Sequence, residues 1–302
     1  MRSFAILSFG AICISFAAIF VKLIGRDAMG PASIAFWRTL FGAGILFSWA
    51  KLAGHSLQLP WSMKRWTVVA GFLFFVDLFC WHRSILLAGA GMSTILANTQ
   101  VFGTAVLSYF IFKERLRLGF FIAAGSAIVG VIMLIGVGSD IDFSPEYLRG
   151  VVFGLLTGVA YAHYIVTLKV AGQREGKPGS FITLMAWTSL FSALFLGAAS
   201  LITERDVFMP PDLFTLFILF SLALVAQAVG WWAISQSLPR IDASRGGLAL
   251  LLQPVLATVW GVIFFAEHLS LLQIIGAAIT LGAIYVGTVR RKVKPPPAPP
   301  AD

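Results

Sequence analysis

Ten long apolar segments follow one another along the 302-residue chain, and they constrain its fold more than any other feature. They cover residues 3–24, 32–53, 66–88, 91–112, 118–137, 148–169, 180–203, 213–235, 242–265 and 270–289. Each is close to the roughly 20 residues with which an α-helix crosses the hydrocarbon core of a bilayer. The bilayer core offers no water to backbone groups, and the segments are too long for barrel strands. We therefore expect an all-α integral membrane protein with ten transmembrane helices.

The composition agrees with a chain that lies in a bilayer. Hydrophobic residues make up 59% of the chain and charged residues only 12%, about half the charged fraction of a soluble domain. The net charge of +9 is best explained by membrane topology and contact with anionic lipids, so the bilayer is an expected partner and nucleic acid is not. The first apolar segment is full length and lacks a cleavage signature, which favours a retained span over a signal peptide.

The distribution of Lys and Arg predicts the orientation. With the N-terminus placed in the cytoplasm, 16 of the 22 Lys and Arg residues fall on the cytoplasmic side, 3 fall outside and 3 lie within helices. Because positive charge accumulates on the cytoplasmic side of membrane proteins, both termini are predicted to be cytoplasmic. The Pro-rich tail at residues 290–302 is expected to be a short extended segment on that side.

The two halves of the chain repeat one another. Matched residues lie 153 positions apart: Gln100 with Gln253, Glu114 with Glu267, and Leu116 with Leu269. We expect one five-helix repeat in residues 1–140 and a second in residues 141–289. Since five is odd, the second repeat enters the membrane in the opposite sense. Inverted repeats of this kind are a plan of secondary transporters, whose substrate site lies near the midplane between the halves.

Two motifs at these matched positions resemble a known family. They run Gln100…Phe112-Lys113-Glu114-Arg115-Leu116 and Gln253-Pro254…Phe265-Ala266-Glu267-His268-Leu269. The chain resembles the EamA-type members of the drug/metabolite transporter superfamily, and among these the YddG-type bacterial exporters of aromatic amino acids. The first half has Val101 where the second has Pro254. The resemblance implies ATP-independent export of small metabolites by alternating access across the bacterial inner membrane.

Asp77 lies at the centre of the third apolar segment and is the one acidic residue far from a membrane surface. A charge at this depth costs at least about 2.5–3.5 kcal/mol on insertion scales. Trp81 and Ser84 share its helix face, whereas His82 lies about 140° round the helix. Asp77 is a candidate for binding a substrate ammonium group or for proton coupling. The alternative is a polar tie between helices.

Three basic residues lie near the expected outer ends of the first three segments: Lys22, Arg38 and Arg83. Long basic side chains at such depths can extend to the lipid headgroups. The alternative is a basic outer vestibule that binds the carboxylate of an amino acid.

Other polar and aromatic residues lie deep within the apolar segments and complete the candidate substrate site. Together with Asp77 they are Trp81, His82, Asn98, Gln100, Tyr161, His163, Tyr164, Gln227, Trp231 and Gln253. A cavity with aromatic walls and a few amides suits a bulky, partly apolar substrate. Packing of aromatic rings between helices is the alternative.

Gly150, Gly154 and Gly158 form a repeated GxxxG pattern, which favours close helix contact.

No catalytic motif is present: the chain has no Gly-rich phosphate loop, paired carboxylates or His-x-x-x-His helix. Cys13 and Cys80 fall within apolar segments, and we expect neither a metal nor a cofactor. His82 and His163 could meet in a bundle, but no third metal ligand accompanies them. A drug transporter of the same fold, or a membrane-embedded enzyme or structural component, is the alternative function. The sequence makes no prediction of oligomeric state.

Overall fold

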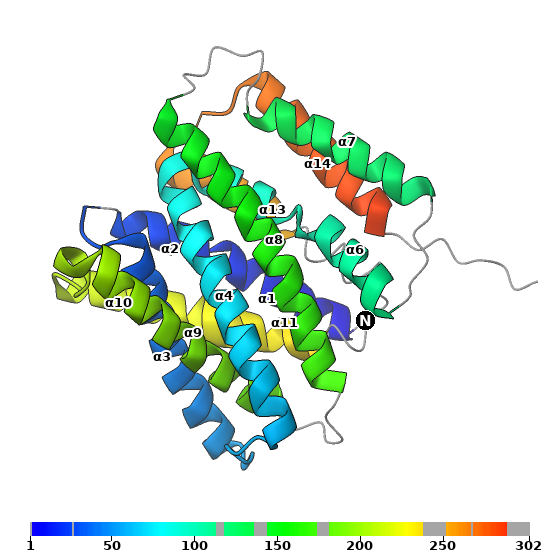
Figure 1. The fold of residues 1–302 in the computed structure, drawn as a ribbon. Helices are drawn as coiled ribbons and strands as arrows, with labels where there is room; N and C mark the ends of the chain where they lie inside the picture. Colours follow the sequence, from blue (N-terminus) through cyan, green and yellow to red (C-terminus); the bar gives the residue numbers. More distant parts are fainter. Residues whose placement is uncertain are drawn as a thin grey trace, which may run out of the picture.

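The computed structural model of the chain describes residues 2–25, 27–112, 118–135, 144–173, 181–237, 252–266 and 268–288. Helices occupy each of the ten apolar segments wherever the structure describes them (Figure 1). Within these described ranges, six helical stretches are long and apolar enough to cross a membrane: Ala5–Ile24, Met63–Ala88, Ala90–Ile111, Pro145–Leu168, Phe181–Thr203 and Leu213–Ser235. The motif residues Glu114 and Glu267, residues 242–251 and the Pro-rich tail lie outside the described residues.

The helices of the first half follow the predicted segments closely. They are α1 (Arg2–Ser15), α2 (Ala17–Ile24), α3 (Pro31–Leu52), α4 (Trp61–Ala88), α5 (Ala90–Ala97), α6 (Gln100–Phe112) and α7 (Leu118–Ile135). Helix α3 begins at Pro31. Proline suits the first position of a helix because the N–H that it lacks would have no partner within the helix. Helix α4 begins after Pro60, five residues earlier than expected, and it ends before Gly89, whose φ of 93° favours glycine.

The second half contains three long helices, several short ones and a π-helix. They are α8 (Pro145–Gln173), α9 (Phe181–Thr203), the 3₁₀-helix η1 (Arg205–Val207), α10 (Leu213–Leu222), the π-helix η2 (Ala223–Gly230), α11 (Trp231–Ser237), α13 (Leu252–Phe265) and α14 (Leu271–Thr288). The segment 213–235 was predicted as one α-helix, and its middle is instead the wider π-helix. Such turns occur often at functional sites.

Two further segments that were predicted as unbroken helices are interrupted, each beside a side chain that bonds the backbone of the preceding turn. Between α1 and α2, the Ser15 hydroxyl donates to the carbonyl of Ile12 at 2.7 Å. Between α5 and α6, the Asn98 amide donates to the carbonyl of Thr94 at 2.8 Å. Short polar side chains that bond the preceding turn in this way weaken or bend helices. Both breaks therefore coincide with polar residues within apolar segments.

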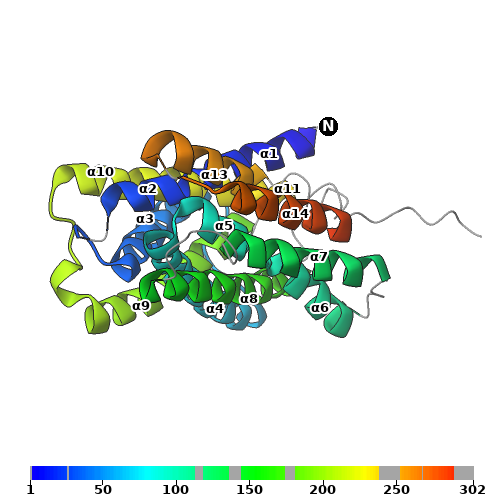
Figure 2. The same cartoon turned by 90° about the horizontal axis from the view of Figure 1, so that it is seen from above.

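The long helices pack in pairs whose members are far apart in the sequence. Helix α4 packs along α8, α3 along α9, and α7 along α14. Figures 1 and 2 both show α7 beside α14 at one side of the bundle.

The glycines of the GxxxG pattern on α8 lie against neighbouring helices. A Cβ atom added to Gly154 would lie 2.7 Å from Leu96 Cδ1 and 2.9 Å from Ser84 Oγ. The prediction that the GxxxG pattern allows close helix contact is thus confirmed.

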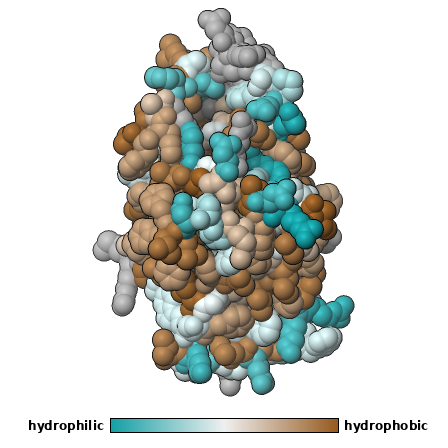
Figure 3. Space-filling model, turned by 90° about the vertical axis from the view of Figure 1, so that its left-hand side faces the viewer, coloured by the Kyte–Doolittle hydropathy of each residue, from teal (hydrophilic) through white to brown (hydrophobic). Residues whose placement is uncertain are grey.

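Large apolar side chains cover much of the outside of the bundle. Phe110, Ile128, Phe217 and Ile263 are each more than 60% exposed. The face shown in Figure 3 is largely hydrophobic across its middle, with hydrophilic side chains gathered above this band and along the lower edge. So much exposed apolar surface suits contact with lipid rather than water.

Candidate functional site

Arg38 of α3 lies in the interior of the bundle, with only 2% of its surface exposed. Its Nε donates to Gln227 Oε1 at 3.2 Å, and its Nη1 lies 3.3 Å from His82 Nε2. The guanidinium also lies over the Trp81 ring, 5.7 Å from the ring centroid. The interpretation that Arg38 extends to the headgroups is therefore wrong, because partners from α4 and η2 replace water around the charge.

His82 joins Arg38 to the first turn of α3. Its Nδ1 lies 3.2 Å from the carbonyl oxygen of Pro31. A carbonyl oxygen only accepts and a guanidinium only donates, so both contacts are satisfied when His82 is neutral with its proton on Nδ1. His82 is fully buried. It was expected to lie away from the face of Asp77, and it reaches the site through Arg38.

Gln227 holds Arg38 from the opposite side. Its amide nitrogen donates to Ser189 Oγ of α9 at 3.0 Å, so its oxygen faces Arg38. The side chain crosses α3 at Gly42, where an added Cβ atom would clash with Gln227 Cγ. The π-helix and this glycine together allow the amide to reach Arg38.

Substituting alanine for Gly42 is expected to destabilise the protein by about 1–3 kcal/mol, because the new methyl group overpacks the interior against Gln227. Gly44 provides a matched control on the same helix, since an added Cβ atom there meets nothing within 4 Å. Alanine at Gly44 should be neutral or stabilising by up to about 1 kcal/mol, the usual helix preference over glycine. Thermal unfolding of both variants in detergent measures the difference. Equal unfolding temperatures would mean that Gly42 does not set this packing.

Asp77 is 6% exposed and lies close enough to Arg38, Tyr161 and Tyr164 to interact with them electrostatically. Among the residues that the structure describes, no donor lies within hydrogen-bonding distance of its carboxylate. Asp77 therefore does not act as a direct polar tie between described helices. It is a buried acid that faces a cation without touching it.

Aromatic rings from α4, α8 and α11 form a cluster beside these charges. The Trp231 ring centroid lies 5.9 Å from that of Tyr161, 5.5 Å from that of Tyr164 and 5.8 Å from that of Phe74. Phe74 and Tyr164 stack at 4.7 Å. The indole nitrogen of Trp231 is buried and has no hydrogen-bond partner within the described residues. Such an N–H normally finds a partner when it is buried.

Three predicted amides lie apart from this charged group. Asn98 and Gln100 are buried and bond within their own segment, Asn98 to the Thr94 carbonyl and Gln100 through its oxygen to Thr104 at 2.8 Å. Gln253 is buried on α13, with 7% of its surface exposed. Within the described residues, no hydrogen bond joins these three to Arg38 or Asp77.

His163 does not belong to the interior site. It is exposed, and its Nδ1 lies 2.8 Å from the carbonyl oxygen of Val159 in the preceding turn. Its placement in the predicted substrate site is wrong because α8 turns this face outwards. His82 and His163 consequently do not meet. No group of three His, Cys, Asp or Glu residues that could hold a metal occurs in the described part of the chain.

The three basic residues lie in different surroundings. Lys22 lies over the Phe265 ring, 4.6 Å from its centroid. Arg83 forms an ion pair with Glu204 at 2.6 Å, whereas Arg38 is enclosed by Gln227 and His82. Each cation thus has a different set of partners, and a common basic vestibule stays a prediction.

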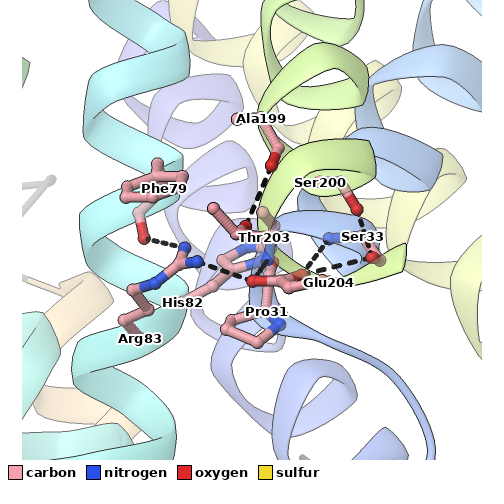
Figure 4. A network of polar contacts seen from close by, with 10 residues as sticks. Pro31, Ser33, Phe79, His82, Arg83, Ala199, Ser200, Thr203 and Glu204 are labelled. Carbon is pink, nitrogen blue, oxygen red and sulfur yellow. Dashed lines mark hydrogen bonds and ion pairs between the residues drawn. The ribbon is translucent and has the colours of Figure 1, made fainter. Parts of the chain in front are cut away.

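Glu204, which follows α9, holds the start of α3 (Figure 4). Its carboxylate accepts from the backbone N–H groups of Ala32 at 3.1 Å and Ser33 at 2.9 Å, as well as from Arg83. It thus caps a helix that begins 173 residues earlier in the chain, at Pro31. Glu204 was not among the predicted site residues. The available signal was that Gly30-Pro31 supplies no capping side chain, although the first turn of a buried helix requires one.

The family comparison gives the identity of the fold. The model of the EamA-like transporter family matches residues 3–136 and also residues 148–288. The chain belongs to the EamA-like transporter family. It is therefore a membrane transporter, as the motifs around Gln100 and Gln253 indicated, and a small-molecule substrate and embedding in the membrane follow from this membership.

Relatives of this EamA-like protein include bacterial, archaeal and plant proteins. A "probable amino-acid metabolite efflux pump" of Salmonella typhimurium is 26% identical over 212 residues, which cover 68% of this chain and 69% of that protein. A WAT1-related chloroplastic protein of Arabidopsis thaliana is 27% identical and shares 85% of this chain and 62% of its own length. An uncharacterized transporter of Archaeoglobus fulgidus is 23% identical, with 93% and 94% covered.

The EamA-like fold also has a solved counterpart. One crystal structure superposes with a TM-score of 0.67 at 21% sequence identity, covering 95% of this chain and 96% of that one. At this identity the likeness concerns the fold alone. It shows that the helices described here adopt an arrangement already seen over almost the full length of another protein.

Proposed function

We propose that this EamA-like protein is a secondary transporter that exports amino acids, aromatic or bulky apolar ones, or closely related metabolites. One observation carries this proposal: two buried and opposite charges, Arg38 and Asp77, lie beside a cluster of aromatic rings inside the bundle. Relatives in Salmonella typhimurium and Escherichia coli carry the name "probable amino-acid metabolite efflux pump", which supports the same substrate class.

The chemistry of the site favours a ligand that is both charged and bulky. Charged residues within a membrane are costly and usually mark a substrate or ion path. The rings of Trp81, Tyr161 and Trp231 offer a large apolar surface beside the charges, and pockets of this composition suit partly apolar small molecules. A purely hydrophobic drug would leave both buried charges without a partner of opposite charge.

Alternating access in this proposal rests on ten spans arranged as inverted repeats, residues 1–140 and 141–289. The helix contacts support such a two-fold relation. The packing of α4 on α8 has a counterpart in the packing of η2 and α11 on α1, and α9 on α4 has one in η2 on α3. The pairs α3 with α9, α5 with α13 and α7 with α14 each join equivalent helices. The family model also matches both halves.

Solute flux into proteoliposomes tests the proposed substrate class. Purified protein should accelerate the flux of phenylalanine, tyrosine, tryptophan or leucine over protein-free liposomes, without ATP, in a screen of the twenty amino acids. Nucleosides and drug-like cations are screened in parallel. Flux of one of these without flux of any amino acid would replace the proposal by a drug or other-metabolite transporter of the same fold.

The proposed orientation, with both termini in the cytoplasm of a bacterial inner membrane, predicts the sides of two exposed positions. Cysteine introduced at Asp206 should react with a membrane-impermeant maleimide in intact spheroplasts, and cysteine at Lys64 only after lysis. The native cysteines give little background because Cys13 and Cys80 are buried. Both introduced positions are exposed. Labelling of Lys64→Cys in intact spheroplasts, with protection of Asp206→Cys, would reverse the proposed orientation.

A further inference from the structure

Two opposite charges lie buried near each other without direct contact. Asp77 is 6% exposed and Arg38 is 2% exposed. Asp77 lies one turn of α4 before Trp81, and the Arg38 guanidinium lies 5.7 Å from the centroid of that Trp81 ring. Within the described residues, the Asp77 carboxylate has no hydrogen-bond donor and no ion-pair partner.

Arg38 also has unused hydrogen-bonding capacity. A guanidinium carries five N–H donors. One N–H at Nε is used by Gln227 and one at Nη1 by His82, so three remain without an acceptor among the described residues. His82 and Gln227 hold the guanidinium from two other elements, and neither contact satisfies the donors that remain.

A buried pair that served only stability would be expected to close. Burial of two charges is repaid only when they bond each other closely and their remaining donors and acceptors are satisfied. Here Arg38 bonds Gln227 and His82, while its other N–H donors and the Asp77 carboxylate have no partner among the described residues. The buried indole N–H of Trp231 is a further unused donor in the same cluster of rings. Unsatisfied groups of three kinds converge on one region, which is the property of a preformed binding site.

We propose that Arg38 binds the carboxylate and Asp77 the ammonium group of one zwitterionic α-amino acid, whose side chain lies against the aromatic cluster of Tyr161, Tyr164 and Trp231. This assignment rests on the proposed function and deepens it by giving each charge of the site its own pole of the ligand. An α-amino acid carries both groups on one carbon atom. A single ligand can therefore satisfy both buried charges at once.

The assignment predicts strict selection for ligands that carry both charges. A ligand that lacks one pole leaves the corresponding protein charge buried and unpaired, and truncation of one partner of a buried charge pair weakens binding by about 100-fold or more. L-Phenylalanine should compete with its own labelled form at least about 100-fold better than phenethylamine, which lacks the carboxylate, or 3-phenylpropionate, which lacks the ammonium group.

The same three compounds, tested on two variants, separate binding from a structural role. In Asp77→Asn the advantage of phenylalanine over 3-phenylpropionate should fall below about 10-fold, while its advantage over phenethylamine remains. In Arg38→Gln the pattern should reverse. Asp206→Asn, the same substitution at an exposed position, should leave both ratios unchanged. A residue that only supports the fold would lower competition by all three compounds together.

The outcomes distinguish this assignment from the proposed function. Transport of phenylalanine with equal competition by all three compounds would overturn the zwitterion assignment and leave the proposed function standing. Parallel loss of all three in both variants would also overturn it. If the variants do not fold, the wild-type selectivity decides alone. Absence of any amino-acid flux would overturn the proposed function, and the assignment with it.

Discussion

Replacing Glu204 with glutamine is expected to destabilise the bundle by about 3 kcal/mol, because it leaves the charge of Arg83 without its partner in a largely buried place. The two side chains are only 15% and 8% exposed and their atoms lie 2.6 Å apart. The substitution also weakens the acceptor that caps the first turn of α3. Thermal unfolding in detergent measures the loss.

Asp206 is the matched control, an exposed acid two residues further along the chain. Asp206→Asn should change the stability by no more than about 0.5 kcal/mol, as surface substitutions usually do. Arg83→Gln should cost about as much as Glu204→Gln, and the double variant should cost less than the two together, since each single variant leaves the other group unpaired. Simple additivity would show that the two side chains act independently.

Replacing Trp231 with alanine is expected to cost about 3–5 kcal/mol of stability, because the indole is 5% exposed and its removal leaves a cavity among three aromatic rings. Affinity for an aromatic amino acid should fall strongly in the same variant. Trp231→Phe retains a ring and lacks the indole N–H, so it should preserve most of the stability while still weakening binding about 10-fold, the worth of one buried hydrogen bond.

Trp66→Ala serves as the comparison for this prediction. Trp66 is only partly buried and packs in a different cluster, with Leu59, Met63 and Leu184. Its loss should leave affinity for the amino acid nearly unchanged, as measured by equilibrium binding of labelled substrate. If Trp231→Ala and Trp66→Ala weaken binding equally, the aromatic cluster around Trp231 supports the fold and does not form the site.

The helices could be predicted from the sequence because the length of an apolar segment is a local property. Their interruptions at Ser15 and Asn98 could have been foreseen only in part, since a polar side chain within an apolar helix has several ways to bond. The π-helix at Gln227 could not be foreseen, because no local pattern marks it and Gln227 packs against Gly42 of a distant helix.

The site was predicted best where a residue type alone carries the signal. A charge at the centre of a span, such as Asp77, is costly wherever it points, and the structure places it in the interior. For Arg38 the sequence allowed two environments, and the decision depended on Gln227, 189 residues away. His163 was placed wrongly because the amino-acid sequence alone does not show which face of α8 contacts other helices. Glu204 was missed because its partners, Ser33 and Arg83, belong to other helices.

Counterflow of labelled phenylalanine tests most directly whether this EamA-like protein carries amino acids by alternating access. Liposomes that contain the protein are loaded with unlabelled phenylalanine and diluted into a trace of labelled phenylalanine, without ATP or an ion gradient. We predict that label accumulates transiently inside the liposomes above its external concentration. Each carrier that releases unlabelled phenylalanine outside can return with labelled phenylalanine, and the unlabelled excess inside competes with the label for exit. Uptake that only approaches the external concentration, or no uptake beyond that of protein-free liposomes, would contradict a carrier of amino acids.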